Sequence, residues 1–121
     1  MKQVMIIDDS PQVRQRIAAM LADNPLIRIV GQAGSAREAL DAVAQCPPDT
    51  VILDIRLPDQ NGLALLKQFK ARYPEMTVIM LTNLDGSRYR QACRNLGADH
   101  FLSKSMDFER LVDTIVGHPV H

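Results

Sequence analysis

Short apolar runs alternate along the chain with segments whose apolar residues recur every three or four positions. The runs have the length of strands and lie at residues 4–7, 27–30, 50–53, 77–81 and 100–102. The recurring segments predict helices packed on one face, and they cover residues 11–23, 36–46, 63–73, 87–96 and 108–117. Five strand–helix units with short connections predict a parallel five-stranded sheet covered by helices on both faces.

Polar and conformationally special residues mark where the predicted elements begin and end. Ser10 and Ser35 precede the first two helices, where a side-chain oxygen can accept a hydrogen bond from an N–H of the first turn. Gly97 follows the fourth helix, a position at which glycine commonly ends a helix. Gly31 and Gly34 are expected to close the second strand.

The run at residues 50–53 has no polar alternation, which is typical of a strand covered on both faces in the middle of a parallel sheet. Asp54 follows the run directly, and Pro58, Asn61 and Gly62 then force an irregular loop. In such sheets, ligand chemistry collects at the carboxyl ends of the strands. Asp54 is therefore the first candidate for a functional residue.

The other strand ends also carry side chains suited to chemistry. The first strand ends in Asp8 and Asp9, the fourth in Thr82, and the fifth leads to Lys104. A flavodoxin-like doubly wound sheet has the strand order 2-1-3-4-5, which makes the first and third strands neighbours. We therefore expect three carboxylates, including Asp54, to crowd into one crevice.

Like charges at short range raise one another's pKa unless a cation lies between them. Lys104 is one such cation, and Mg²⁺ is another because it binds carboxylates, waters and phosphate oxygens. Asp54 has the chemistry to accept a phosphoryl group as an acyl phosphate, and Lys104 would balance the charge during transfer. Thr82 would bond the transferred group, so the pattern indicates a phosphate-handling site.

Composition narrows the class of protein. The 121 residues are 46% apolar and 23% charged, which fits one globular domain over residues 1–121. A net charge of zero gives no support to direct nucleic-acid binding. No run is long enough to span a membrane, and the acids at Asp8 and Asp9 interrupt any secretory signal. Cys46 and Cys93 are expected to be free, buried thiols, which suits the cytoplasm.

Over nearly its whole length, the sequence resembles the receiver domains of bacterial two-component response regulators. The matching residues are Asp8, Asp9, Asp54, Pro58, Gly62, Thr82, Gly97, Ala98, Phe101 and Lys104. The resemblance implies a signalling module with limited self-catalysed phosphotransfer and dephosphorylation, rather than a metabolic enzyme. It further implies a sensor histidine kinase or a phosphotransfer protein as the phosphodonor.

The same resemblance implies a role for each site residue. Asp54 is the expected phosphorylation site, and Asp9 and Asp54 are expected to ligate Mg²⁺ directly. Asp8 would act on the metal through water, and the backbone carbonyl of Arg56 would complete the protein ligands. The first strand, the third strand and the loop after it would thus supply the metal site.

Two further residues are implied to form a conformational switch. The Thr82 hydroxyl would move toward the phosphoryl group while the Phe101 ring turns inward. Output would pass through the surface of the fourth helix, fifth strand and fifth helix, to a homodimer mate or an output partner. Arg88, Arg90 and Arg94 make the fourth helix basic, either as a solvated face or as a protein-docking surface.

Three positions depart from the common receiver pattern. Ser105 follows Lys104 where many receivers have a proline with a cis peptide bond before it. A cis bond before serine costs about 3–4 kcal/mol, so either local contacts impose it or the bond is trans. Asn83 replaces a small residue after Thr82 and is expected to slow both phosphorylation and hydrolysis. Arg56 places a cation at the rim of the site, to recruit a phosphodonor or to shield the acyl phosphate.

The rival interpretations fail at particular residues. A phosphatase of the haloacid dehalogenase type needs a second acid two residues after its nucleophile, where this chain has Arg56. A receiver-like module that no longer uses phosphate would lack Asp9, Asp54 or Lys104. A flavin-binding flavodoxin needs a phosphate-cradling loop after the first strand, where this chain has acids.

Overall fold

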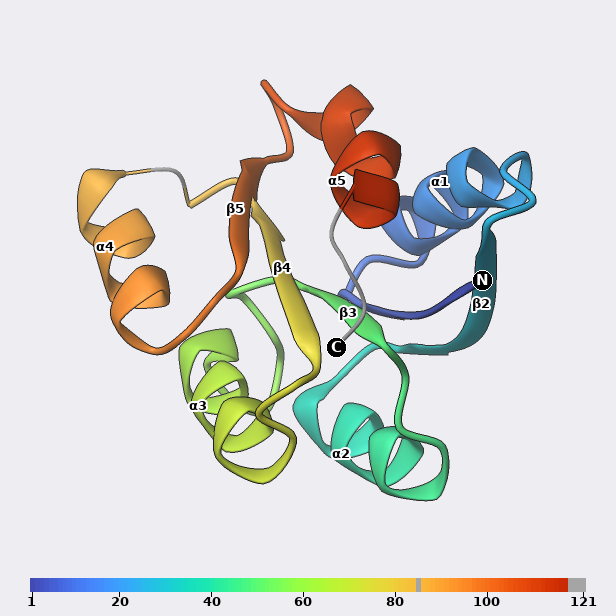
Figure 1. Ribbon diagram of the computed structural model, residues 1–121. Helices are drawn as coiled ribbons and strands as arrows, with labels where there is room; N and C mark the ends of the chain where they lie inside the picture. Colours follow the sequence, from blue (N-terminus) through green and yellow to red (C-terminus); the bar gives the residue numbers. More distant parts are fainter. Residues whose placement is uncertain (85, 118–121) are drawn as a thin grey trace.

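The sheet has the predicted parallel topology. The computed structural model describes residues 1–84 and 86–117, and within them five parallel strands lie in the order β2-β1-β3-β4-β5 (Figure 1). The strands are β1 Lys2–Ile7, β2 Ile27–Ala33, β3 Thr50–Leu53, β4 Thr77–Thr82 and β5 His100–Ser103. The helices are α1 Pro11–Ala22, α2 Ala36–Gln45, α3 Gly62–Arg72, α4 Ser87–Asn95 and α5 Leu111–Gly117, with a 3-10 turn at Phe108–Arg110 before α5.

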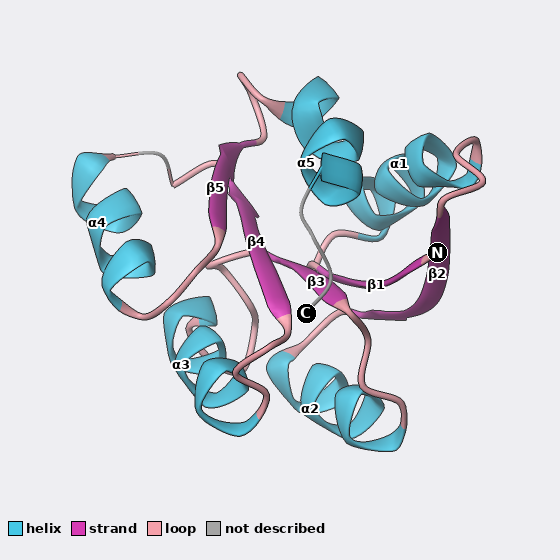
Figure 2. Ribbon diagram, viewed as in Figure 1, coloured by secondary structure: helices cyan, strands magenta, loops and turns pink. Residues whose placement is uncertain are grey.

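Helices cover both faces of the sheet. Figure 2 shows α1 and α5 on one face and α2, α3 and α4 on the other. Each face has its own apolar core, one built around Phe69 of α3 and the other around Leu111 of α5. Every residue of β3 and β4 is buried, which confirms that the central strands lack a solvent-facing side.

The helix boundaries follow from the residues that mark them in the sequence. The Ser10 hydroxyl accepts a hydrogen bond from the N–H of Val13, and the Ser35 hydroxyl accepts one from Glu38. Gly97 has a φ of +98°, a conformation that glycine adopts without strain just after a helix. Within the described residues, no helix has both the length and the apolar character needed to cross a lipid bilayer.

The second strand is longer than the sequence indicates, because Gly31 does not close it. The strand runs on to Ala33, with Gly31 paired to Met5 after a shift of register on β1. A Cβ atom at Gly31 would lie 3.2 Å from the methyl carbon of Met5. Gly31 thus lies inside the strand in close contact with Met5 rather than in a turn.

The prediction for the two cysteines is half correct. Cys93 on α4 is a buried, free thiol, and burial raises its pKa to about 11. Cys46 is free but exposed at the end of α2. Helical spacing from Ala39 and Val43 puts Cys46 on the buried face, but α2 ends at Gln45 and Cys46 lies beyond its last turn, which explains the error.

Candidate functional site

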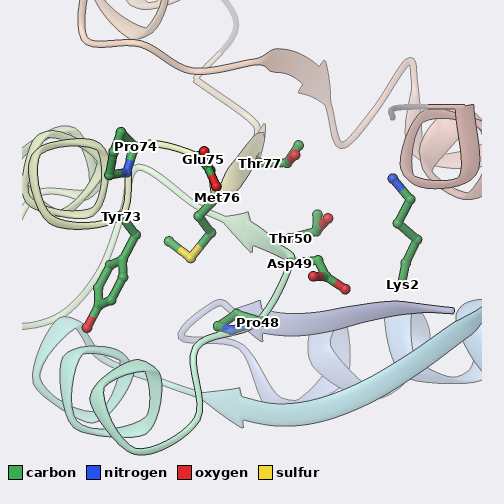
Figure 3. Close-up of a pocket in the computed structure, with 9 residues that line it drawn as sticks. All are labelled: Lys2, Pro48, Asp49, Thr50, Tyr73, Pro74, Glu75, Met76 and Thr77. Atoms are coloured by element: carbon green, nitrogen blue, oxygen red, sulfur yellow. The ribbon is translucent and has the colours of Figure 1, made fainter. Parts of the chain in front are cut away.

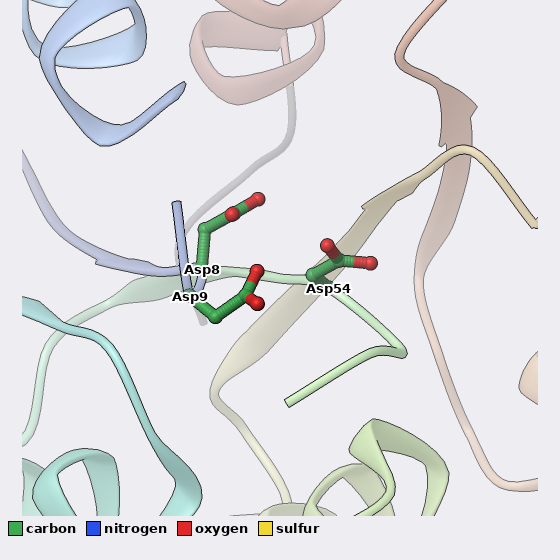
Figure 4. A group of neighbouring side chains, drawn as sticks. All are labelled: Asp8, Asp9 and Asp54. Carbon is green, nitrogen blue, oxygen red and sulfur yellow. The ribbon is translucent and has the colours of Figure 1, made fainter. Parts of the chain in front are cut away.

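The carboxyl ends of β1 and β3 bring three carboxylates together. These strands pair up to Ile7 and Leu53, so Asp8 and Asp54 leave the sheet side by side. One carboxylate oxygen from each of Asp8, Asp9 and Asp54 lies within 4.8 Å of the other two (Figure 4). Asp8 and Asp54 are buried, whereas Asp9 is exposed at the mouth of the cluster.

Asp8 is the most tightly held of the three acids. One of its carboxylate oxygens accepts the N–H of Ser10 at 2.9 Å, and the other contacts the Lys104 ammonium at 2.7 Å. Burial raises the pKa of Asp8 and outweighs the opposing hydrogen bonds from Lys104 and Ser10, while the nearby charge of Asp54 raises it further. The buried Asp8 carboxyl therefore holds its proton to a higher pH than a solvent-exposed aspartate does, because its pKa is raised.

Lys104 bridges two of the carboxylates from the far side of β4. Its ammonium nitrogen lies 2.7 Å from Asp8 Oδ2 and 2.8 Å from Asp54 Oδ2. Burial alone would lower the pKa of Lys104, but the bonds to Asp54 and Asp8 outweigh it and raise that pKa. The described residues contain no cis peptide bond, so the bond before Ser105 is trans and Lys104 reaches the acids from it.

The loop after β3 fixes the orientation of Asp54. Asp54 is 5% exposed, and its second carboxylate oxygen accepts the N–H of Arg56 at 3.3 Å. The loop closes where the N–H of Gly62 donates to the carbonyl of Ile55 at 2.6 Å and where Arg56 pairs with Asn61. The Arg56 side chain is exposed at the rim, as the sequence indicates.

Thr82 and Phe101 lie on the same side of the molecule as the acids, on adjacent strands. Thr82 is buried at the carboxyl end of β4, and its hydroxyl accepts the N–H of Leu84 at 3.2 Å. Phe101 on the edge strand is half-buried and pairs with Met80. The guanidinium of Arg90 lies 4.7 Å from the centre of the Phe101 ring, a distance at which a cation and an aromatic ring attract.

Asp59, which the sequence does not single out, connects the loop after β3 to α2. Its two carboxylate oxygens accept the backbone N–H groups of Ala36 at 2.9 Å and Arg37 at 3.0 Å. These groups belong to the first turn of α2, where N–H groups lack partners within the helix and a negative charge is favoured. No local signal reveals this cap, because the partners are 23 and 22 residues away in the chain.

Replacing Asp59 with Ala should lower the free energy of unfolding at neutral pH. The N–H groups of Ala36 and then Arg37 hold the pKa of the Asp59 carboxyl below its usual value. A lowered folded-state pKa gives stability above the unfolded pKa of about 3.9, and this is lost as the pH falls through the folded value. Urea unfolding followed by circular dichroism should show a difference from wild type that shrinks in acid. Asp41→Ala, which removes an exposed acid on α2, is the control, and a difference independent of pH would contradict the cap.

The donor set of the carboxylate cluster suits a hard divalent cation. Three carboxylate oxygens converge within 4.8 Å, and the backbone carbonyl of Arg56 belongs to the adjoining loop. Oxygen-only donor sets favour Mg²⁺ or Ca²⁺ over the softer transition metals. The residues present therefore fit such an ion.

A separate pocket of about 380 Å³ lies at the opposite edge of the sheet (Figure 3). It is formed at the amino ends of β3 and β4, and it is lined by Lys2, Pro48, Asp49, Thr50, Tyr73, Pro74, Glu75, Met76 and Thr77. The buried hydroxyls of Thr50 and Thr77 lie at its floor. The carboxylate cluster is nevertheless the better candidate site, because there three carboxylate oxygens lie within 4.8 Å of one another and a lysine contacts two of the acids at hydrogen-bond distance.

A second cavity lies directly beside the loop after β3. Its volume is about 460 Å³, and the loop residues 55–61 line it together with Leu84 and Tyr89. It opens between the loop after β3 and the start of α4. The side of this loop that faces α4 is therefore hollowed rather than closed.

Comparison with known proteins agrees with this geometry. A family model described as the response regulator receiver domain matches residues 4–116. The protein-glutamate methylesterase/protein-glutamine glutaminase of Geobacillus kaustophilus is 30% identical over 125 residues, covering 98% of this chain and 36% of that protein. The protein of the same name from Agrobacterium fabrum is 45% identical over 82 residues, covering 68% and 23%. The chain thus spans about a quarter to a third of the length of these relatives.

Solved structures give the same match. The crystal structure of a two-component response regulator of the LuxR family from Aurantimonas sp. SI85-9A1 superposes with a TM-score of 0.90 at 26% identity. The match covers 97% of this chain and 84% of that one. The topology of the sheet, the geometry of the site and the sequence similarity thus all indicate the same protein family.

Proposed function

Since this chain belongs to the response regulator receiver domain family, we propose that Asp54 accepts a phosphoryl group from a sensor histidine kinase or a phosphotransfer protein. Receiver domains are the phosphorylatable aspartate switches of two-component signalling, and they interact with such donors. The observation that carries the assignment to Asp54 is the bridging position of Lys104. Its ammonium lies 2.8 Å from Asp54 and 2.7 Å from Asp8. Asp9, the third acid of the cluster, is exposed at its mouth.

In the proposed reaction, a phosphoryl group moves from an oxygen or nitrogen atom of the donor to a carboxylate oxygen of Asp54. A carboxylate oxygen of Asp54 forms a bond to phosphorus while the bond from phosphorus to the donor breaks, a P–N bond where the donor is a phosphohistidine. The Lys104 ammonium then faces the new charge on the phosphoryl oxygens, and Thr82 supplies a hydroxyl at the same edge. The product is an acyl phosphate on Asp54.

Mg²⁺ is the cation that we assign to the carboxylate cluster. Asp9 and Asp54 would hold it directly, Asp8 through water, and the carbonyl of Arg56 would be the third direct protein ligand. When bound, it would neutralise charge on the phosphoryl oxygens during transfer. The converging carboxylate oxygens of Asp8, Asp9 and Asp54 support this assignment.

The proposed output uses the surface of α4, β5 and α5. Thr82 and Phe101 are the proposed switch pair, because they link the site to that surface through the adjacent strands β4 and β5. The Arg90 guanidinium over the Phe101 ring would have to yield as the ring turns inward. A homodimer mate or an output protein is the proposed partner at this surface, and the basic side chains of α4 support a protein-docking role.

For the chain as a whole, we assign one receiver domain to residues 1–121, acting in the cytoplasm. The two free cysteines fit a reducing compartment. A receiver domain is a signalling module, and its proposed chemistry is limited to its own phosphotransfer and dephosphorylation. The esterase and glutaminase activities belong to the longer proteins that bear those names.

Intact-mass spectrometry tests the central proposal. After incubation with acetyl phosphate and Mg²⁺, the chain should gain the mass of one phosphoryl group. The gain should be lost when EDTA removes the metal, because the carboxylates then repel the incoming phosphate. A chain that keeps its original mass with donor and metal present would refute phosphate acceptance.

Two exposed residues at the rim should set the lifetime of the acyl phosphate. Asn83 follows Thr82 and Arg56 follows the acceptor by two residues, and both are exposed. Asn83→Ala should speed both phosphorylation and hydrolysis severalfold because it opens access to Asp54. Arg56→Ala should slow phosphorylation or speed hydrolysis, depending on whether the cation recruits the donor or shields the product. The decay of the phosphorylated mass measures each lifetime, and unchanged lifetimes would remove both roles.

A further inference from the structure

The turn that carries Lys104 is closed by hydrogen bonds rather than by a proline. Ser103, the last residue of β5, donates its N–H to Asp107 Oδ2 at 3.0 Å. Its carbonyl oxygen accepts the N–H of Asp107 at 2.8 Å. The Ser103 and Ser105 hydroxyls lie 3.0 Å apart. Asp107 thus bonds both backbone groups of the residue that precedes Lys104.

Two of the three residues between Ser103 and Asp107 are exposed to solvent. Ser105 is exposed, and Met106 is 79% exposed. Beyond the turn, Phe108 is buried and anchors the chain in the core on the α5 side. Asp107 therefore lies between the buried strand end at Ser103 and the buried Phe108, in the loop that joins β5 to α5 (Figure 2).

The chemistry of Asp107 suits this task. The N–H of Ser103 is the main cause that holds the pKa of the Asp107 carboxyl below its usual value. A charged acceptor makes a stronger bond to an N–H than a neutral one does. Its contact with Arg110 is longer, at 3.4 Å, and the arginine side chain is 71% exposed, so the bond to Ser103 is the dominant one.

Lys104 depends on its backbone being held, because a lysine side chain is long and flexible. Its own N–H donates to the carbonyl of Thr82 at 3.0 Å, which fixes one side of its backbone. From this backbone position its ammonium reaches both Asp8 and Asp54. The other side of the backbone enters the turn that Asp107 closes.

We propose that Asp107 is a positioning residue, which closes the turn after β5 and so holds the Lys104 ammonium between Asp8 and Asp54. This inference rests on the proposed role of Lys104 in phosphoryl transfer. Asp107 touches no reacting atom and acts through the lysine.

Amine labelling of Lys104 tests the position directly, without phosphorylation. The Lys104 side chain is 13% exposed and paired with two acids, so an amine-reactive ester should label it slowly. Asp107→Ala should raise the labelling rate of Lys104 roughly tenfold, the scale expected for losing a charged hydrogen bond. Asp107→Asn keeps an acceptor for the Ser103 N–H and should stay within about twofold of wild type. Peptide mass spectrometry measures each lysine separately.

Two other lysines and one acid serve as controls. Lys67 is exposed on α3, and Lys70 is half-buried in a pair with Asp99, so both should label at wild-type rates. Asp113→Ala removes an exposed negative charge from α5 without touching the turn, and it should leave Lys104 protected. An unchanged Lys104 rate in Asp107→Ala, or a matching rise at Lys70, would overturn the inference.

Phosphorylation then tests whether the position matters for transfer. Asp107→Ala should slow phosphorylation by acetyl phosphate in the wild-type background and have no further effect in a Lys104→Ala background. Equal slowing in both backgrounds would mean that Asp107 acts independently of the lysine, which overturns the inference. If the wild-type chain gains no phosphoryl mass at all, the proposed function fails, while the labelling rates still decide the role of Asp107.

Discussion

Replacing Asp54 with Asn should abolish phosphorylation of the chain by acetyl phosphate in the presence of Mg²⁺. A carboxylate oxygen carries the charge needed to form an acyl phosphate, whereas an amide oxygen of the same size does not. The substitution also removes one of the three acids whose oxygens lie within 4.8 Å, and so weakens Mg²⁺ binding. Intact-mass spectrometry should show no added phosphoryl group in the variant under conditions that convert the wild type.

The Asn variant should remain folded, which makes the loss interpretable. Asp54 and Asp8 are buried like charges that share one lysine, and removing one charge relieves their repulsion. We therefore expect its unfolding midpoint in urea to equal or exceed that of wild type. Asp41→Asn, an exposed change on α2, should be phosphorylated normally. A phosphoryl group on the Asp54→Asn chain would place the acceptor elsewhere in the cluster.

Replacing Gly62 with Ala should destabilise the fold by about 3 kcal/mol or more, because the new Cβ has no room. It would overlap the carbonyl oxygen of Asp54 and lie 2.7 Å from Cα of Ile55. The atoms in the way are backbone atoms of the buried segment after β3, which cannot rotate aside as a side chain can. The loop after β3 must therefore shift, and phosphorylation of Asp54 should slow as well.

Urea unfolding curves for Gly62→Ala and Gly117→Ala give a matched comparison. Both glycines lie within helices, but nothing lies within 4 Å of a Cβ at Gly117. The Gly117 variant should differ from wild type by at most about 1 kcal/mol, the scale of helix propensity. Equal effects in the two variants would show that the close approach at Gly62 is relieved at little cost.

Much of the site was open to prediction because strand ends are visible in the sequence. Asp8, Asp9 and Asp54 each follow an uninterrupted apolar run, and the parallel topology sends such positions to one edge. The structure places these three acids and Lys104 together, as expected. The roles given to Asp54, Arg56, Thr82 and Phe101 remain predictions for the experiments above.

The wrong and the missing predictions concern features that only the packed structure shows. A glycine in isolation favours a turn, so the sequence predicts a strand end at Gly31, whereas in the sheet Gly31 pairs with Met5 inside the strand. Cys46 was expected to be buried because helical spacing cannot show where a helix stops packing. The sequence does not reveal the roles of Asp59 and Asp107, because no pattern of side chains shows which backbone N–H groups a carboxylate accepts. Asp59 accepts those of Ala36 and Arg37, and Asp107 accepts that of Ser103.

By itself, the sequence determined the order of strands and helices, the central buried strand, and the set of charged residues at the strand ends. Those features depend on local periodicity and on the residues that start or stop each element. Only the tertiary structure decided how the charges meet. Lys104 contacts Asp54 across 50 positions of the chain, and Asp59 caps α2 across 22 and 23. Such contacts depend on register and turn geometry, which set distances that composition and spacing do not encode.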